Sequence, residues 1–338
     1  MNHKIIQHNK PSLGLEEQKA AIRVLKSGYI SQGKEVEQFE NEFCKFIGLP
    51  NGHAVAVSNG TSALFLSLWV LNAKNKEISF PTYVCASVRD STSMSGGKEK
   101  INDIFPNTPN LDMSKIDIKN TISIIPHMYG IPNDFTSLQN TNVIEDCAQA
   151  LGAKINKKFV GVHGKIGIFS FYATKLMTSG GQGGMLISNE KKLIDKVRDF
   201  REFDLKSDEK RRFNFQMTDI QAAIGREQLK KLPLFLKRRE EIFQKYKKAG
   251  LDLLDIDSHD THLEPVRYRA VMKTKNPKKI IEKLDKNGIK AIIPIQDWEL
   301  LGNKKKYQNA LKLAKESVSL PIYPTLTNKD IDIILESL

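Results

Sequence analysis

Three short segments carry residue types that could do chemistry, and the first of them, residues 58–64, suits phosphate binding. Gly60 allows a tight turn, and Thr61 and Ser62 supply hydroxyl and N–H groups at the positive end of a following helix. The same residues could simply cap that helix, which is their commoner role. The familiar signatures G-x-x-x-x-G-K-S/T and G-x-G-x-x-G after a strand do not occur in the sequence.

The second segment ends an apolar run with two adjacent carboxylates, Glu145 and Asp146. Carboxylates at the end of a buried strand are unfavourable unless another group binds them. Strand ends of α/β folds point into the ligand crevice, where an aspartate can keep the ring nitrogen of a pyridine-type cofactor protonated. The alternative is that a carboxylate caps the next helix.

The third segment places Lys175 between the apolar residues 169–171 and the glycine-rich residues 180–184. No other charged residue occurs between positions 166 and 189, whereas surface lysines normally lie on charged faces. Burial lowers the pKa of a lysine, and a neutral amine can form a Schiff base with an aldehyde. A snorkelling lysine at a strand end is the alternative, and the glycines indicate either close approach to a ligand or a loop.

These segments must be positioned by regular elements, and the sequence predicts an α/β arrangement for them. Short apolar strands that alternate with helices predict parallel crossovers in a sheet covered on both faces. Thr218 is expected to cap a helix that extends to Lys248, and an α+β pattern follows Gly250. The expected strands are 54–57, 77–80, 121–125, 142–144, 168–171, 185–188, 266–272 and 291–294, and the other expected helices are 61–71, 277–287, 306–316 and 328–338.

The composition is that of a globular protein, with 338 residues of which 40% are hydrophobic and 27% are charged. The apolar run 63–71 is too short for a membrane helix, and residues 1–4 lack the apolar stretch of a signal peptide. We therefore expect a cytoplasmic protein with no membrane partner. The three cysteines have no paired spacing, so neither a disulfide framework nor a metal site is expected.

The net charge of +13 has several readings. Nucleic-acid binding would favour a single basic stripe, whereas the basic clusters at 210–212, 237–239 and 304–306 are scattered along the chain. We therefore expect solvated basic faces and no nucleic-acid partner. Part of this charge could also attract an anionic substrate or cofactor.

A phosphate segment, an aspartate and then a lysine form the order expected of a pyridoxal-phosphate site. The sequence resembles the DegT/StrS family of sugar-nucleotide aminotransferases from Gly28 to its C-terminus. The motifs that carry this resemblance lie at 28–33, 58–64, 80–83, 127–130, 145–150, 170–184, 214–229 and 319–324.

The resemblance implies a fold-type-I pyridoxal-phosphate transferase of the α/β class. Its large domain, with a mostly parallel sheet covered by helices, would comprise residues 1–235. A connecting helix and a smaller C-terminal α+β domain would comprise residues 236–338.

The resemblance also implies roles for individual residues. Lys175 would be catalytic, as the Schiff-base lysine and proton carrier, Asp146 would pair with the ring nitrogen, and Gln149 would lie beside the ring. Asn214 would reach the phosphate of a neighbouring subunit, which implies a homodimer with shared sites. The implied cofactor-binding residues are Gly60, Thr61, Ser62, Cys85, Asp146, Gln149, Ser170, Lys175 and Asn214. The implied substrate residues are Tyr29, Ser31, His127 and Tyr129, although core packing is an alternative for His127 and Tyr129.

The sequence departs from the family pattern at two positions. Cys85 stands where an aromatic residue usually covers the cofactor ring, so either this thiol or another residue such as Tyr83 would cover it. Gln216 stands where an arginine usually follows the asparagine by two residues, which removes one cation from the subunit boundary.

The implied function is transfer of an amino group from an amino acid, L-glutamate by analogy, to a keto-sugar carried on a nucleotide diphosphate, with pyridoxal 5'-phosphate as cofactor. One alternative is a pyridoxal-phosphate sugar dehydratase, although colitose-type dehydratases have histidine at the position of Lys175. Another is a non-catalytic regulatory or DNA-binding protein on the same fold, which the net charge would favour.

Overall fold

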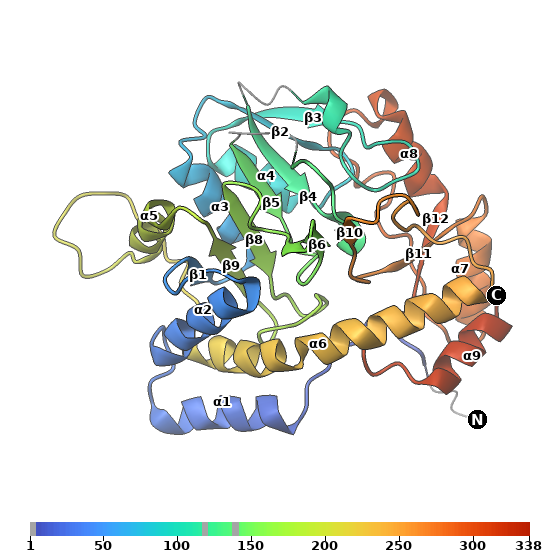
Figure 1. The fold of residues 1–338 in the computed structure, drawn as a ribbon, viewed down its shortest axis with the longest axis horizontal. Helices are drawn as coiled ribbons and strands as arrows, with labels where there is room; N and C mark the ends of the chain where they lie inside the picture. The colour runs from blue at the N-terminus through green and yellow to red at the C-terminus, as the bar shows by residue number, and fades with distance from the viewer. Residues whose placement is uncertain (1–4, 117–120, 137–141) are drawn as a thin grey trace.

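The computed structural model describes residues 5–116, 121–136 and 142–338, so the expectation for residues 1–4 lies outside the described residues. Within them, seven strands form a central sheet in the order β1-β9-β8-β5-β4-β2-β3 (Figure 1). The neighbouring strands pair in parallel from β8 to β3, and β9 is antiparallel to both of its neighbours. These strands are β1 (Ala54–Val57), β2 (Glu77–Pro81), β3 (Lys98–Asn102), β4 (Ile122–Pro126), β5 (Val143–Asp146), β8 (Ile166–Ser170) and β9 (Gly184–Ile187).

The predicted mostly parallel sheet is confirmed, and its inner strands are buried because helices cover both faces. Every residue of β1, β4 and β5 is buried, as expected for apolar strands without a solvent face. Along β8 the side chains alternate. The Phe169 ring packs against the Phe43 ring of α2, with 5.0 Å between the ring centres, whereas Ser170 faces Gly60, the first residue of α3. The helices are α1 (Leu15–Ser27), α2 (Lys34–Ile47), α3 (Gly60–Val70), α4 (Ser87–Met94), α5 (Lys191–Arg201), α6 (Asp219–Lys248), α7 (Pro277–Lys286), α8 (Gln308–Lys315) and α9 (Asn328–Glu336).

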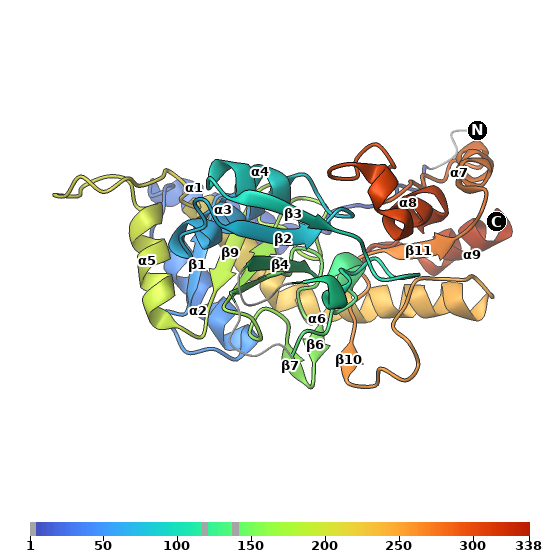
Figure 2. The same cartoon turned by 90° about the horizontal axis from the view of Figure 1, so that it is seen from above.

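Helix α6 joins the large sheet to the C-terminal elements (Figure 2). It begins where predicted, because the Thr218 hydroxyl accepts a hydrogen bond from the Gln221 N–H while the Gln221 side chain bonds back to Thr218. Its second half packs against a separate cluster of buried side chains that includes Ile242, Phe243 and residues of β11, β12 and α9. The proposed division after residue 235 stays a prediction.

The C-terminal part contains a two-stranded sheet of β11 (Ala270–Lys273) and β12 (Ser317–Leu320). The strand predicted over 266–272 is therefore shorter and lies further along the chain. The strand predicted over 291–294 is wrong: within the described residues Ile292 makes only an isolated bridge to Ser319, and the Pro294 nitrogen has no hydrogen to donate to a strand ladder. A third sheet joins β10 (Leu263–Glu264), β6 (Lys154–Ile155) and β7 (Lys158–Phe159).

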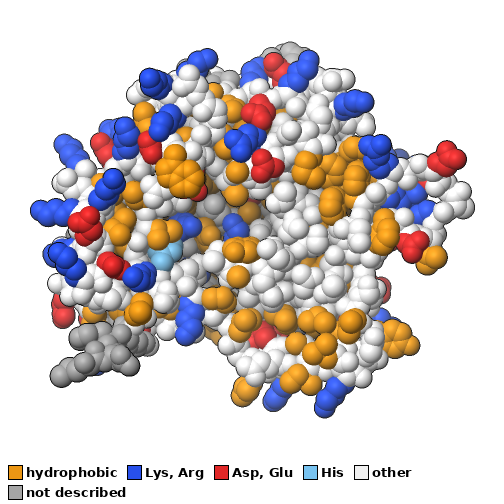
Figure 3. Space-filling view, turned by 180° about the vertical axis from the view of Figure 1, so that it is seen from behind, with side chains coloured by type: hydrophobic (Ala, Val, Ile, Leu, Met, Phe, Trp, Pro, Cys, Tyr) orange, Lys and Arg blue, Asp and Glu red, His pale blue; other side chains and the backbone are white. Residues whose placement is uncertain are grey.

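One face of the molecule carries its charge in a dispersed form. On the face drawn in Figure 3, Lys and Arg side chains are spread over much of the surface and do not form a single stripe. None of the helices among the described residues has the length and apolar character needed to cross a membrane.

Candidate active site

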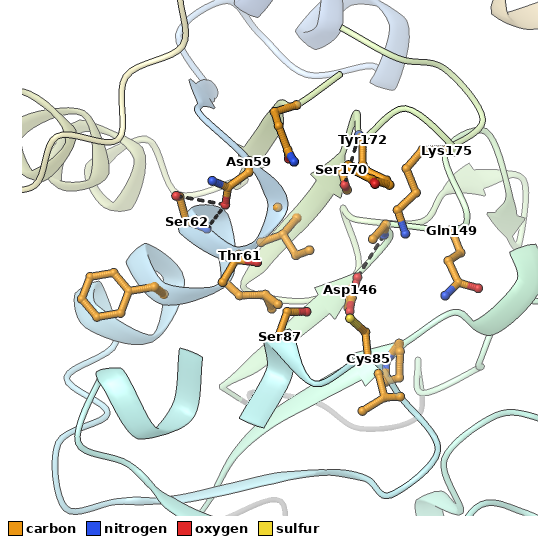
Figure 4. Close-up of a pocket in the computed structure, with 18 of the residues that line it drawn as sticks. Asn59, Thr61, Ser62, Cys85, Ser87, Asp146, Gln149, Ser170, Tyr172 and Lys175 are labelled. Carbon is orange, nitrogen blue, oxygen red and sulfur yellow. Dashed lines mark hydrogen bonds between the residues drawn. The ribbon is translucent and has the colours of Figure 1, made fainter. Parts of the chain in front are cut away.

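A cavity of about 570 Å³ opens where β4, β5 and β8 end beside the N-terminus of α3 (Figure 4). The carboxyl ends of parallel strands meet at one edge of a sheet, so residues far apart in the sequence converge there. The lining includes these predicted residues: Gly60, Thr61, Ser62, Cys85, His127, Asp146, Gln149, Ser170 and Lys175. The cavity therefore gathers all three segments that the sequence singled out.

The N-terminus of α3 forms one side of the cavity, and two close approaches of the backbone shape it. A Cβ atom on Gly60 would lie 3.0 Å from the Cβ of Ser170, and one on Gly184 would lie 2.5 Å from the Asn59 carbonyl oxygen. Asn59 caps the helix, because its side-chain oxygen accepts hydrogen bonds from the N–H and the hydroxyl of Ser62. Capping and phosphate binding are thus compatible, since the capped helix still directs its positive end toward the cavity.

Asp146 is buried at the end of β5 and lines the cavity. Among the described residues its carboxylate accepts a single hydrogen bond, from the Ala148 N–H at 3.0 Å. Burial raises the pKa of Asp146, and the opposing effects of that N–H, Lys175 and His127 are smaller. A cationic group in the cavity would stabilise this carboxylate.

Glu145, the preceding residue, faces a different environment. Its carboxylate accepts hydrogen bonds from the backbone N–H groups of Gly161, His163 and Gly164 at 2.6–2.8 Å, and it lies 3.2 Å from His127 Nε2. Burial would raise the pKa of Glu145, but His127 and these N–H groups outweigh burial and lower it. Glu145 therefore anchors the loop that leads into β8.

His127, Glu145 and Cys147 place three possible metal ligands within 4.8 Å of one another. The lone pairs of the first two are already engaged: His127 Nδ1 accepts the Asn133 N–H, so Nε2 carries the hydrogen and donates it to Glu145. This arrangement supports the core-packing alternative for most of the His127 ring, although the ring also reaches the cavity wall.

Gln149 is oriented by the backbone of Tyr129. The Gln149 side-chain oxygen accepts the Tyr129 N–H at 2.9 Å, so its amide nitrogen is the group left to donate. Tyr129 adopts the left-handed conformation (φ 59°), which is uncommon for a bulky residue, and its hydroxyl lies 2.7 Å from that of Tyr83. Tyr83 is fully buried, so Cys85 is the residue of this segment that borders the cavity together with Val84.

Lys175 is half-buried in a loop that several hydrogen bonds hold in place. Its N–H donates to the Tyr172 carbonyl at 2.9 Å, and the Asn9 side chain donates to the Thr174 carbonyl at 2.7 Å. In the described part of the chain, Lys175 Nζ forms no hydrogen bond or ion pair; it lies 5.3 Å from the centre of the Tyr268 ring. An amine held without a polar partner beside the cavity is suited to covalent chemistry.

Tyr268 lies beside the Lys175 amine, and the sequence analysis did not single it out. Burial would raise its pKa, but the cations of Lys175 and Arg269, together with hydrogen bonding from Thr174, lower it to about 8. Tyr268 comes from the segment before β11, far along the chain from Lys175. The predicted strand over 266–272 included this residue, but no sequence signal pointed to the side chain that it would meet.

Four predicted residues do not line the cavity of this single chain. Tyr29 has 84% of its surface exposed, and Asn214 is also exposed. Ser31 is exposed and its carbonyl accepts the Asp219 N–H. Tyr129 is buried beside the cavity, where it contacts Gln149 and Tyr83. The roles of these four residues stay predictions.

Comparisons with known proteins cover almost the whole chain. The model of the DegT/DnrJ/EryC1/StrS aminotransferase family matches residues 11–338. GDP-perosamine synthase of Escherichia coli O157:H7 is 30% identical over 99% of this chain and 98% of its own. Helicobacter pylori PseC, an aminotransferase involved in the biosynthesis of pseudoaminic acid, is 26% identical with a TM-score of 0.87 over 99% of this chain and 98% of its own. DesV of S. venezuelae, solved in complex with a ketimine intermediate, is 25% identical, with a TM-score of 0.88 over 95% of this chain and 93% of its own.

Proposed function

The chain belongs to the DegT/DnrJ/EryC1/StrS aminotransferase family, and on this basis we propose that it transfers an amino group from L-glutamate to a keto-sugar carried on a nucleoside diphosphate, with pyridoxal 5'-phosphate as its cofactor. The observation that carries this proposal is the position of Lys175. Its amine and the Asp146 carboxylate border one cavity, beside the positive end of α3.

The residues of the cavity fit a phosphorylated pyridine with an aldehyde group. The N-terminus of α3 and Ser170 would hold the phosphate, because this side supplies backbone N–H and hydroxyl donors around Gly60. Asp146 would pair with the ring nitrogen, and a ring cation would stabilise its desolvated carboxylate. Gln149 presents its amide nitrogen as a donor, because Tyr129 already engages its oxygen.

Bound pyridoxal phosphate would supply an electron sink for the carbanion that forms when the amino acid loses its α-proton. Lys175 would bond to the cofactor carbonyl and, once displaced by the amino donor, would move the proton as a general base and then a general acid. Asp146 would keep the ring nitrogen protonated throughout. Cys85 would lie where the family usually places an aromatic ring.

The substrate class rests on the names of the relatives. Besides the GDP-perosamine synthase, a 28% identical relative from Campylobacter jejuni is named UDP-4-amino-4,6-dideoxy-N-acetyl-beta-L-altrosamine transaminase and covers 94% of this chain. Both names specify a sugar on a nucleoside diphosphate. The basic surface of this chain would favour such an anionic substrate.

A homodimer with shared sites is part of this proposal. Helix α1 buries Ala20 and Val24 against α6, yet on its outer side Leu15, Ile22 and Leu25 are each at least half exposed. These three residues follow helical spacing and make one apolar stripe, which a second copy of the chain would cover. Figure 3 shows hydrophobic side chains along the lower edge of the molecule, where α1 lies. Exposed Asn214 is then free to reach the partner's phosphate site.

The test is the visible absorption spectrum of the purified protein with pyridoxal phosphate, before and after L-glutamate. We expect a yellow band that glutamate bleaches, and we expect Lys175→Ala to lack this response. Lys158→Ala, at an exposed lysine of β7, is the matched control and should behave as wild type. Incubation with a GDP-linked and a UDP-linked keto-sugar, followed by mass spectrometry, then identifies the amino product.

Wild-type protein that shows no yellow band with pyridoxal phosphate would contradict the catalytic proposal and favour a binding protein. A glutamate response without an amino-sugar product from either nucleotide would contradict the proposed acceptor while leaving the amino-transfer step intact.

A further inference from the structure

Lys175 Nζ lies over the face of an aromatic ring that the C-terminal part of the chain supplies. The Tyr268 ring centre is 5.3 Å from the amine, within the range at which the negative face of a ring attracts a cation. Tyr268 is 4% exposed, so water screens this attraction little.

The backbone of Tyr268 is held on both sides by hydrogen bonds. Its N–H donates to the Tyr129 carbonyl at 3.2 Å, and its carbonyl accepts from Arg239 Nη1 at 3.2 Å. One of these contacts ties it to the turn that orients Gln149, and the other ties it to α6. Burial and a hydrogen bond with the Thr174 side chain restrain the ring itself, so it can hold a flexible lysine with little ordering cost of its own.

Other charged groups surround the pair, and they act in different directions. Asp146 borders the same cavity, and the charge of Lys175 partly offsets the burial that raises the pKa of Asp146. The Arg269 guanidinium lies 5.2 Å from the same ring, and Arg239 also interacts with Tyr268, so both oppose a further cation there. His8 contacts Arg269, and burial together with Arg269 and Arg239 lowers the pKa of His8 to about 3, which keeps it neutral.

We propose that the Tyr268 ring is the seat on which Lys175 rests in its ammonium form, once the free amine has taken up a proton, which makes Tyr268 a positioning residue for proton transfer by Lys175. This inference rests on the proposed function and deepens it. The amine that leaves the cofactor carbonyl is held at the cavity edge, within reach of both the next proton and the return bond. The C-terminal part of the chain thereby contributes to the reacting centre.

The test measures Lys175 in the full-length protein without cofactor, by competitive labelling with limiting trinitrobenzenesulfonate and mass spectrometry of the labelled peptides. The reagent attacks only the uncharged amine, so a seat that favours the ammonium slows labelling. Tyr268→Leu removes the ring, and we expect labelling of Lys175 at pH 8 to rise about tenfold. Tyr268→Phe keeps the ring and should stay within about twofold of wild type.

Lys154 provides an internal control in the same samples, because its Nζ lies 5.5 Å over the Phe159 ring in the exposed hairpin. Its labelling should not change in any Tyr268 variant. Thermal unfolding confirms that each variant is folded, and Tyr268→Met replaces the leucine variant if that variant does not fold.

Two outcomes would contradict the proposal that the Tyr268 ring holds the Lys175 ammonium. Lys175 that labels at the wild-type rate in Tyr268→Leu and Tyr268→Met would show that the ring does not hold the amine. A phenylalanine variant that labels as fast as the leucine variant would assign the effect to the phenol oxygen. Protein that labels as expected but binds no pyridoxal phosphate would instead contradict the proposed function alone.

Discussion

Glu145 and Asp146 are adjacent carboxylates at the end of one strand, and the fold treats them in opposite ways. Glu145 is surrounded by backbone N–H groups and His127, and these lower its pKa despite complete burial. Asp146 receives the Ala148 N–H and otherwise borders the cavity, and burial raises its pKa. Successive side chains of a strand point to opposite faces, so a shift of one residue separates a loop anchor from a ligand group.

This difference shows how to separate a structural carboxylate from a functional one. A buried carboxylate with a full set of donors is satisfied by the protein itself. A buried carboxylate that lacks donors and faces a cavity is destabilising until a cation binds. The resemblance already implied the role of Asp146, and the hydrogen-bond partners of the two residues supply the physical reason for it.

The largest expected effect is on the functional member of the pair. Asp146→Asn should lower the rate of amino transfer by about 10²- to 10³-fold, because an amide cannot hold the proton of the ring nitrogen by charge. Steady-state kinetics with L-glutamate and the keto-sugar measure this loss. Asp90→Asn, at an exposed carboxylate of α4, is the control. If Asp146→Asn transfers amino groups at a rate within a few-fold of wild type, Asp146 is not the functional carboxylate of the pair.

The next effect is on stability and concerns the structural member. Glu145→Gln should lower the free energy of unfolding by about 2–3 kcal/mol, because the new amide nitrogen faces backbone N–H donors and leaves them without an acceptor. Urea unfolding measures it, with Glu99→Gln on the exposed side of β3 as the control. If Glu145→Gln unfolds at the same urea concentration as wild type, Glu145 is not the anchor.

The smallest expected effect is on the pH dependence of stability, measured in protein without cofactor. The raised pKa of Asp146 makes its ionised form unfavourable, so this cost appears as pH rises above the ordinary value of 3.8 and through the folded-state pKa. Asp146→Asn should therefore unfold at a higher urea concentration than wild type at pH 7, with a gain that shrinks on acidification.

Glu145 should give the opposite sign in the same experiment. Its pKa is lowered, so its ionised form contributes stability that is complete above the ordinary value of 4.5 and is lost as pH falls through the folded-state pKa. The deficit of Glu145→Gln should therefore also shrink in acid. Urea midpoints of both variants between pH 7 and pH 3 check this, because the Glu145 contribution is lost only below pH 4.5. Differences of the same sign would contradict the contrast.

Much of the fold could be predicted because its signals are local. The apolar runs that became β1, β2, β4, β5, β8 and β9 are continuous, and the capping pair Thr218 and Gln221 marks the start of α6. β3 (Lys98–Asn102) was missed because its sequence Lys-Glu-Lys-Ile-Asn is polar and its strand lies at the sheet edge. Strand β12 was missed because Ser317 and Ser319 are polar yet buried against β11.

The candidate site could be predicted to the level of residue identity but not of contact. Gly60, Asp146 and Lys175 stood out because their types are unusual next to apolar runs. Nothing local indicated that the Tyr129 backbone would orient Gln149 or that Tyr83 would be buried away from the cavity. These contacts depend on the left-handed turn at Tyr129, which the sequence does not signal.

The sequence by itself determined which residues could do chemistry here and which apolar strands would carry them to one sheet edge, because both are patterns within a few neighbouring positions. No local pattern separates Asp146 from Glu145: the tertiary structure shows that Asp146 faces the cavity, as the resemblance implied, and that the Tyr268 ring lies beside the Lys175 amine. The first follows from the alternation of side chains along a strand whose pairing must be known, and the second from packing between segments far apart in the chain.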